Sequence, residues 1–340
     1  ELASRDRDTI LRLLGLFGEF SQTLPAIFQL QDLVNLDLTM PLAEGGHGII
    51  YKAIYKNQII CVKAVRMYHR QSAKAELAAR AREIGLAAHL SHSNILPFLG
   101  SAVSSEKVPR MCFVFPWMEN GNLVRYLKVH PEIHRIPLLH DIISALGFLH
   151  QNGIVHGSLK ASKVLVSETG HAILADFIMS SRDQFSLITD FSNLSISVNW
   201  MAPELLVLKP RPTHASDIWA FGCVCYEVLT GLIPFHEYQT IPQVIRAVIK
   251  QEVPSKPSND GWDELSEKAW SLMEECWKYG SDQRPNSEQL RDALSKFNLV
   301  DHRPSPMSPA HWVKKDGPKI DYARVIEILH EVLQSATTEP

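Results

Sequence analysis

Near the start of the chain, apolar residues recur at helical spacing. Within residues 5–20, Ile10, Leu13 and Phe17 fall on one face, which predicts an amphipathic helix. A second such pattern covers residues 322–333. Either face could pack on its own domain or dock on another protein, and the sequence leaves both alternatives open.

Between these two segments the pattern first favours strands and later favours helices. Runs of apolar and β-branched residues predict strands at 34–42, 59–65 and 111–115. Residues 72–90 are rich in Ala, Arg and Glu and predict a helix, and residues 136–151 predict a long buried helix.

Composition narrows the class of protein. A chain of 340 residues, 45% hydrophobic and 21% charged, makes one large globular domain or two small ones. The net charge of -3 gives no reason to expect nucleic acid as a partner.

Five cysteines without paired spacing indicate a reducing compartment, and Cys223 and Cys225 fit core packing. The longest apolar run, 218–229, is interrupted by Glu227, so we expect a cytoplasmic protein without a membrane span or a leader.

Two local patterns suggest phosphate chemistry. Residues 42–53 contain Gly45, Gly46 and Gly48, and glycine lets backbone amides approach a phosphate, although a hairpin turn would explain the same residues. Lys63 lies in an apolar strand, where a lysine is costly unless it is paired or binds a ligand.

Two further features leave alternatives open. Glu83 is a candidate partner for Lys63, or one more surface charge. His89 and His92 could be mistaken for metal ligands, but we expect their ordinary role, which is structural.

The order of the motifs resembles the protein kinase superfamily and, within it, the tyrosine-kinase-like group. The motifs that carry the resemblance are the glycine-rich segment 42–53, Lys63, His92–Leu96, the hinge-like stretch 115–123, the loop His156–Val166, Asp176–Phe177, Ala202–Glu204, Asp217–Gly222, Cys276–Trp277 and Arg284–Pro285. The resemblance implies an α+β fold with a small antiparallel-sheet lobe and a larger helical lobe. It also implies an ion pair between Glu204 and Arg284, an anchoring role for Asp217, and spine roles for His156 and Phe177.

The implied domains are an N-terminal helical extension, 1–34; the small lobe, 35–118; the large lobe, 119–298; and a proline-containing linker with a C-terminal helix, 299–340. The residues that the resemblance assigns to a nucleotide are Leu42, Gly45, Gly46, His47, Gly48, Ile50, Cys61, Lys63, Glu83, Phe115, Trp117, Met118, Leu165 and Asp176. Among these, Phe115 is the expected gatekeeper, backbone groups near Trp117 and Met118 are expected to pair with adenine, and Asp176 is the expected metal ligand.

The catalytic loop departs from the family pattern at three positions. Gly157 replaces the arginine, Ser158 the catalytic aspartate, and Lys163 the metal-binding asparagine, whereas Lys160 is kept. Ser158 is no base near neutral pH, and losing general-base assistance lowers a rate by about 10² to 10⁴. Lys163 would repel a divalent cation, pair with Asp176 or a phosphate in the metal's place, or point to solvent.

These departures lead to three hypotheses of function. The first is a pseudokinase that serves as a scaffold or allosteric module for other signalling proteins. The second is a weakly active protein kinase with a displaced base, and the third is a nucleotide sensor. Lys63, Glu83 and Asp176 favour ATP binding, while Ala43, Ile178 and Lys163 count against it, and Lys163 argues against Mg²⁺.

Overall fold

The computed structural model describes residues 30, 40–45, 48–65, 90–103, 110–176, 198–207, 211–257, 264–297 and 300–308. The predicted helices at 5–20 and 322–333 lie outside the described residues, as does nearly all of the predicted helix 72–90 and most of the predicted strand 34–42. The chain divides into two compact units. Of the described residues, the first unit contains those up to 91 and 97–117, and the second contains 92–96 and 118–308.

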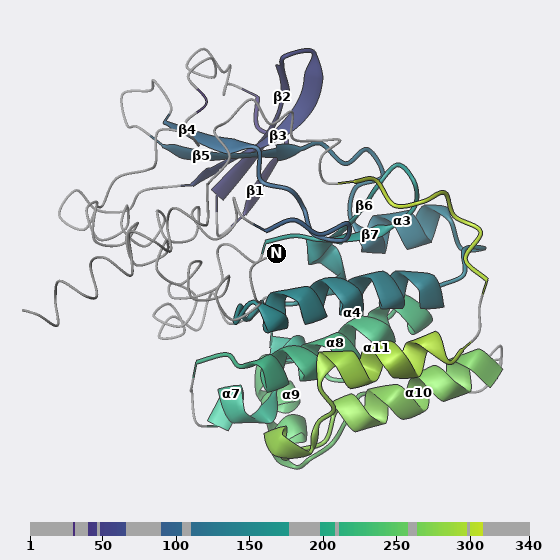
Figure 1. Ribbon diagram of the computed structural model, residues 1–340. Helices are drawn as coiled ribbons and strands as arrows, with labels where there is room; N and C mark the ends of the chain where they lie inside the picture. Colours follow the sequence, from purple (N-terminus) through teal and green to yellow (C-terminus); the bar gives the residue numbers. More distant parts are fainter. Residues whose placement is uncertain are drawn as a thin grey trace, which may run out of the picture. The chain divides into compact units, whose positions relative to one another are not determined.

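The first unit contains a five-stranded antiparallel sheet in the order β1-β2-β3-β5-β4 (Figure 1). Its strands are β1 (Ala43–Gly45), β2 (Gly48–Tyr55), β3 (Gln58–Val65), β4 (Gly100–Val103) and β5 (Met111–Pro116). The strands predicted at 59–65 and 111–115 are confirmed as β3 and β5.

Buried side chains from neighbouring strands form the core of this sheet. Val62, Cys112 and Val114 are fully buried, and Tyr51 is 2% exposed. β3 lies between β2 and β5, and its last four residues, 62–65, form a continuous buried run. Lys63 lies inside that run, beside Ile50 and Phe113 in register, and is itself buried.

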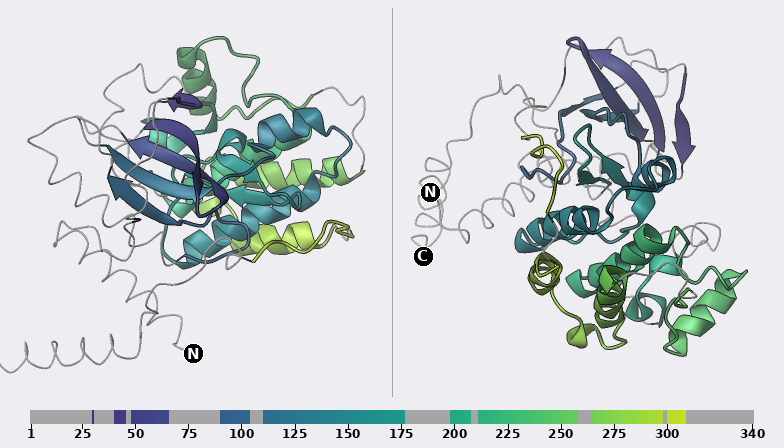
Figure 2. Two further views of the ribbon diagram at one scale, coloured as in Figure 1. Left: turned by 90° about the horizontal axis from the view of Figure 1, so that it is seen from above. Right: turned by 90° about the vertical axis from the view of Figure 1, so that its right-hand side faces the viewer.

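The second unit is mainly helical. Its elements are α3 (Leu123–Val129), α4 (Ile136–Gln151), η3 (Ala161–Lys163), β6 (Val164–Val166), β7 (Ala172–Leu174), η5 (Val198–Trp200), α7 (Pro203–Val207), α8 (His214–Thr230), α9 (Ile241–Ile249), α10 (Glu264–Cys276), η6 (Ser281–Gln283) and α11 (Ser287–Ser295). The predicted helix 136–151 is confirmed as α4, which lies beside α11 (Figure 2). The sheet in one unit and the helices in the other confirm the predicted α+β class.

Helix α8 is the central element of the second unit. Thr213 and Ser216 form a capping box at its start, and Gly231 ends it with a φ of 72°, a left-handed conformation that favours glycine. Its side chains are buried on nearly all sides, with Trp219 and Tyr226 among the largest fully buried groups. A helix so fixed at both ends can hold the side chains that it presents to the neighbouring loops in constant positions.

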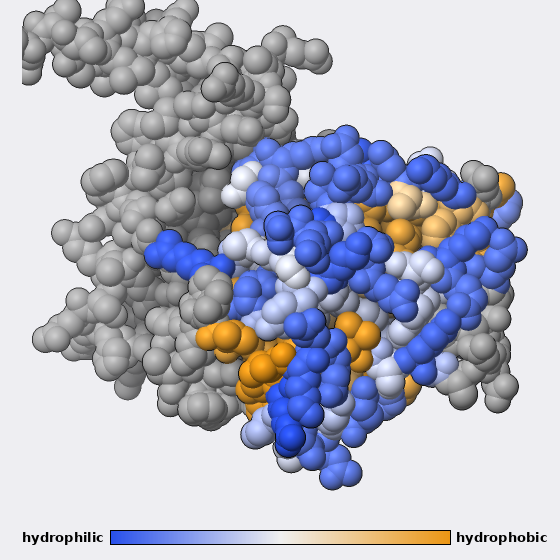
Figure 3. Space-filling view, turned by 90° about the horizontal axis from the view of Figure 1, so that it is seen from below, coloured by the Kyte–Doolittle hydropathy of each residue, from blue (hydrophilic) through white to orange (hydrophobic). Residues whose placement is uncertain are grey.

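From below, the visible surface of the second unit is mostly hydrophilic, with apolar groups between polar ones (Figure 3). The exposed apolar side chains of this unit include Val207, Ile233, Ile249 and Val253. Among the described residues, no helix combines the length and the apolar character that crossing a bilayer requires.

Candidate functional site

Asp217 of α8 fixes the start of the loop that follows α4. Its carboxylate accepts hydrogen bonds from the backbone N–H of His156 at 2.8 Å and of Gly157 at 2.7 Å. The ring of His150 lies 3.0 Å from the same carboxylate, and Asp217 is only 1% exposed. The anchoring role that the resemblance implied for Asp217 is therefore confirmed by its contacts.

His156 is a packing residue of this loop. It is fully buried, and its Nε2 lies 3.1 Å from the carbonyl oxygen of Ala175. Burial lowers the pKa of His156 to about 4, although Asp217 acts in the opposite direction. The ring is therefore neutral near pH 7. Gly157 has a φ of 72°, so the residue that replaces the family's arginine adopts a conformation that glycine reaches without strain.

Ser158 and Lys163 meet in the loop. Lys163, the last residue of η3, is half-buried, and its Nζ donates a hydrogen bond to the Ser158 Oγ. The alternative in which Lys163 points to solvent is therefore wrong. The two family positions that lost a carboxylate and an amide now hold a hydroxyl and an ammonium group in direct contact.

Asp176 lies near this pair. Lys163 lowers the pKa of His156 while Asp176 raises it, so both charges act on the same buried ring. The backbone also links the two segments, because the N–H of Ala175 donates to the Lys163 carbonyl at 3.2 Å. Asp176 itself has a φ of 63°, a left-handed conformation that aspartate tolerates better than most residues. Phe177 and Ile178 lie outside the described residues.

A second carboxylate of α8 contacts the loop. Glu227 accepts hydrogen bonds from the Ala161 N–H at 2.9 Å and from the Trp200 Nε1 at 2.7 Å. Burial raises the pKa of Glu227 to about 7, although these two bonds and the charge of Lys160 oppose the rise. The Lys160 Nζ lies 5.7 Å from the centre of the Trp200 ring, and burial lowers the pKa of Lys160.

Sequence reasoning missed Glu227 as a site residue. It noted this glutamate only as an interruption of the apolar run 218–229. The available signal was a charged residue in an otherwise buried helix, because such a group is retained only with polar partners.

In the first unit, the described residues of the glycine-rich segment from 43 on belong to β1 and β2, which pair antiparallel. Gly48 has a φ of 139°, and a Cβ there would lie 2.5 Å from the Ala64 carbonyl oxygen, so a side chain would clash with the backbone of β3. Leu42 is exposed and its N–H donates to the Ile50 carbonyl at 2.8 Å. Cys61 is half-buried in β3. Of the other residues predicted here, Gly45 pairs with Gly48 across the strands, while Gly46, His47 and Glu83 lie outside the described residues.

The gatekeeper and the first hinge residue belong to the same sheet. The ring of Phe115 is buried and packs edge-on against Phe98, with 5.9 Å between the ring centres. The N–H of Trp117 donates to the Ile59 carbonyl at 3.3 Å. The expected pairing of adenine with backbone groups near Trp117 and Met118 remains a prediction.

Met118 and Leu165 belong to the second unit. Met118 is 5% exposed, and its carbonyl accepts from the Gly121 N–H at 3.0 Å. Leu165, at the middle of β6, is half-buried and forms an isolated bridge with Asn122. Of the two residues expected to pair with adenine, Met118 keeps a backbone N–H that makes no hydrogen bond within the described part of the chain.

The predicted ion pair between Arg284 and Glu204 is present. The guanidinium donates to both carboxylate oxygens at 2.8 Å, and the Arg284 side chain is fully buried. This bidentate pair connects the segment before α11 to α7.

His92 has the structural role that was expected. Its Nδ1 accepts from the Asn94 N–H at 3.1 Å, and its ring lies 5.0 Å from that of Phe148. His89 lies outside the described residues. Within the described ranges, no group of three or more His, Cys, Asp or Glu residues could hold a metal ion.

Comparisons with known proteins agree with this geometry. The sequence profile of the family described as "Protein tyrosine and serine/threonine kinase" matches residues 36–294. The chain is 29% identical over 272 residues to "Serine/threonine-protein kinase STY46" of Arabidopsis thaliana, covering 78% of this chain and 45% of that protein. It is also 29% identical over 276 residues to "Serine/threonine/tyrosine-protein kinase HT1" of the same plant, covering 78% and 67% of the two chains. A fungal relative, "Cell division control protein 7" of Schizosaccharomyces pombe, is 29% identical over 254 residues, covering 73% of this chain and 22% of its own. The chain thus spans less than half the length of the first of these relatives. Because the family profile covers residues 36–294, the chain belongs to the protein tyrosine and serine/threonine kinase family.

Proposed function

We propose that this chain is a pseudokinase, a kinase domain that transfers no phosphate, binds ATP without a metal ion, and serves signalling proteins as a scaffold or allosteric module. The observation that carries the proposal is the hydrogen bond from the Lys163 Nζ to the Ser158 Oγ. It joins the two positions at which the family uses a base and a metal ligand.

The first argument concerns the missing base. Active kinases of this family use an aspartate that accepts the proton of the substrate hydroxyl. The Ser158 hydroxyl carries no charge, and its oxygen already accepts a bond from an ammonium group, which reduces its capacity to take a proton. Loss of this assistance corresponds to about 3 to 5 kcal/mol in the activation barrier.

The second argument concerns the metal. Kinases generally bind ATP with Mg²⁺, whose ligands are carboxylate, amide and phosphate oxygens. Here the second ligand position holds the cation Lys163, and a unit charge 4 Å from another is worth roughly 4 kcal/mol at an effective dielectric of 20. The residues of the loop therefore do not fit a divalent ion well. The ammonium of Lys163 would instead neutralise part of the phosphate charge.

The proposed partners are other proteins of a signalling pathway, and the proposed compartment is the cytoplasm. Four of the five cysteines are buried, which suits thiols that pack in a core in a reducing compartment. The net charge of -3 gives no support to a nucleic-acid partner.

The alternative is a weakly active kinase, and two observations favour it. The relatives STY46 and HT1 are named as protein kinases. Glu227, which contacts the loop at Ala161, has a pKa of about 7, a value that suits a general base near neutral pH.

A phosphotransfer assay with purified protein separates the two functions. The pseudokinase proposal predicts no labelling of the chain or of generic protein substrates above background. Labelling that survives repurification and disappears in Lys63→Met would establish the kinase instead. If such activity also disappears in Glu227→Gln, that glutamate is the displaced base.

A further inference from the structure

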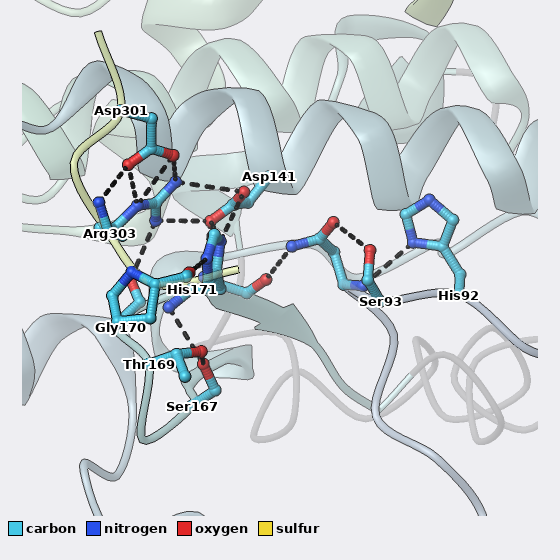
Figure 4. A network of polar contacts seen from close by, with 12 residues as sticks. His92, Ser93, Asp141, Ser167, Thr169, Gly170, His171, Asp301 and Arg303 are labelled. Carbon is cyan, nitrogen blue, oxygen red and sulfur yellow. Dashed lines mark hydrogen bonds and ion pairs between the residues drawn. The ribbon is translucent and has the colours of Figure 1, made fainter. Parts of the chain in front are cut away.

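Residues 300–308, which follow the part of the chain matched by the kinase family, form an arm along the second unit (Figure 1), and Figure 4 shows the polar contacts of its residues Asp301 and Arg303. The Arg303 Nη1 donates to the Asp141 Oδ2 at 2.8 Å and to the Gly170 carbonyl at 2.9 Å. Asp141 belongs to α4, and Gly170 lies in the turn between β6 and β7. The arm is therefore joined through one guanidinium to two separate elements.

A neighbouring histidine holds the backbone of the arm. The Nδ1 of His171 lies 3.3 Å from the Asp141 carboxylate, and its Nε2 lies 2.9 Å from the Pro304 carbonyl oxygen. Both ring nitrogens face acceptors, and only the imidazolium form donates from both. Burial opposes this charge, but the bonds to Asp141 and Pro304 outweigh it and raise the pKa of His171.

The rest of the arm is mostly exposed. Of residues 300–308, Arg303 and Met307 are half-buried and all the others are exposed, and no regular secondary structure is present. Asp141 also accepts a bond from the Ala172 N–H at 2.9 Å, so this buried carboxylate would keep partners if Arg303 left. Such an arm can dissociate without leaving an isolated charge inside the domain.

Ser305 is placed to control this attachment. It is exposed, it precedes Pro306, and within the described residues its hydroxyl makes no hydrogen bond. Asp301 shows that an anion two positions from Arg303 can reach the guanidinium, since its Oδ2 lies 2.7 Å from the Arg303 Nη2. A phosphate on Ser305 would stand two positions away on the other side.

We propose that Ser305 is a phosphorylation site, modified by a proline-directed protein kinase, and that its phosphate releases the arm from Asp141. In this transfer the Ser305 Oγ forms a bond to the γ-phosphorus of ATP, and the bond from that phosphorus to the β–γ bridging oxygen breaks. ADP leaves, and the hydroxyl proton passes to the base of the modifying kinase.

The release follows from the local charges. Asp141 and Asp301 carry two negative charges and Arg303 carries one positive charge, to which His171 adds a second when its ring is protonated. The Tyr126 hydroxyl, which also lies near Arg303, is neutral because burial raises its pKa. A phosphate adds about 1.5 to 2 negative charges, competes with Asp141 for Arg303 and repels both carboxylates.

The test uses the full chain and a fluorescent probe peptide with the sequence of residues 300–308. The peptide can bind only where the arm has left its site. Four proteins are compared: the unmodified chain, Arg303→Ala, the chain phosphorylated at Ser305, and the chain phosphorylated at Ser308. Ser308 is the matched control, because a proline also follows it but it lies five positions from Arg303.

Arg303→Ala and the Ser305-phosphorylated chain are expected to bind the probe at least ~10-fold more tightly than the unmodified chain and the Ser308-phosphorylated chain. A probe with alanine in place of its arginine should bind none of them. The proposal fails if a proline-directed kinase leaves Ser305 unmodified, if Arg303→Ala does not bind the probe, or if phosphorylation of Ser305 leaves probe binding unchanged.

Discussion

Breaking the buried ion pair between Arg284 and Glu204 should destabilise the second unit, and more so when the arginine is removed. Besides its two bonds to Glu204, Arg284 donates to the carbonyls of Lys278 at 2.8 Å, Ala215 at 2.9 Å and Tyr279 at 3.2 Å. Its guanidinium also lies 5.2 Å from the centre of the Trp219 ring. One side chain thus satisfies acceptors on several segments.

Substituting the arginine and substituting the glutamate leave different polar groups without a partner. Arg284→Met leaves the Glu204 carboxylate, only 17% exposed, without its cation and leaves three carbonyls without this donor. Removing one partner of a buried pair costs about 3 to 5 kcal/mol. Glu204→Gln keeps an acceptor oxygen, and Arg284 keeps its three carbonyls, so the expected cost is about 1 to 3 kcal/mol.

Urea unfolding followed by tryptophan fluorescence measures both costs, because Trp219 packs against the guanidinium. Lys268→Met is the matched control, since Lys268 pairs with Glu264 on the surface, with side chains 53% and 82% exposed. An exposed pair of this kind contributes ~0.5 kcal/mol or less. The reasoning is refuted if Arg284→Met costs no more than Lys268→Met, or less than Glu204→Gln.

Two further predictions concern α8. Gly222→Ala places a Cβ 2.7 Å from the Trp277 Nε1 and should lower the free energy of unfolding by about 1 to 3 kcal/mol. In the control Gly147→Ala, the new Cβ lies 3.5 Å from its nearest neighbour, so the free energy of unfolding should change little. Equal shifts of the melting temperature in the two variants would contradict this reasoning. Glu227 has a pKa of about 7 in the folded chain against an ordinary value of 4.5, so its contribution to stability is full below about pH 4.5 and is lost as the pH rises through 7. As the pH rises from 5 to 8, the free energy of unfolding of Glu227→Gln, measured in urea, should therefore increase relative to that of the wild type. A difference between the two proteins that stays constant with pH would contradict the raised pKa of Glu227.

Much of the fold was predictable because local pattern and motif order agreed. The apolar run around Lys63 predicted β3, and the apolar pattern of 136–151 predicted α4 with the bounds observed. The pairing of Arg284 with Glu204 followed from the kinase resemblance, because a residue pair at recognised motif positions is placed by the family's fold.

What could not be predicted depends on contacts between segments distant in sequence. Arg303 and Asp141 are 162 positions apart, and no periodicity relates them. The pKa of Glu227 is set by burial and by its bonds to the loop, neither of which a single charged residue reveals. For Lys163 the sequence left pairing and solvent exposure equally open, because the direction of a long side chain is decided by its neighbours.

The most direct test of the proposed function is the thermal stability of the full chain with ATP, in EDTA and in Mg²⁺, compared with Lys163→Asn. Lys128→Asn, a change at the end of α3, is the control for loss of a lysine charge. ATP at one hundred times its dissociation constant stabilises a protein by ~2.7 kcal/mol. We expect the wild type and Lys128→Asn to be stabilised by ATP in EDTA with little change on adding Mg²⁺, while Lys163→Asn loses stabilisation in EDTA. A wild-type shift that requires Mg²⁺, or no shift with ATP under either condition, would contradict the proposal that Lys163 takes the place of the metal.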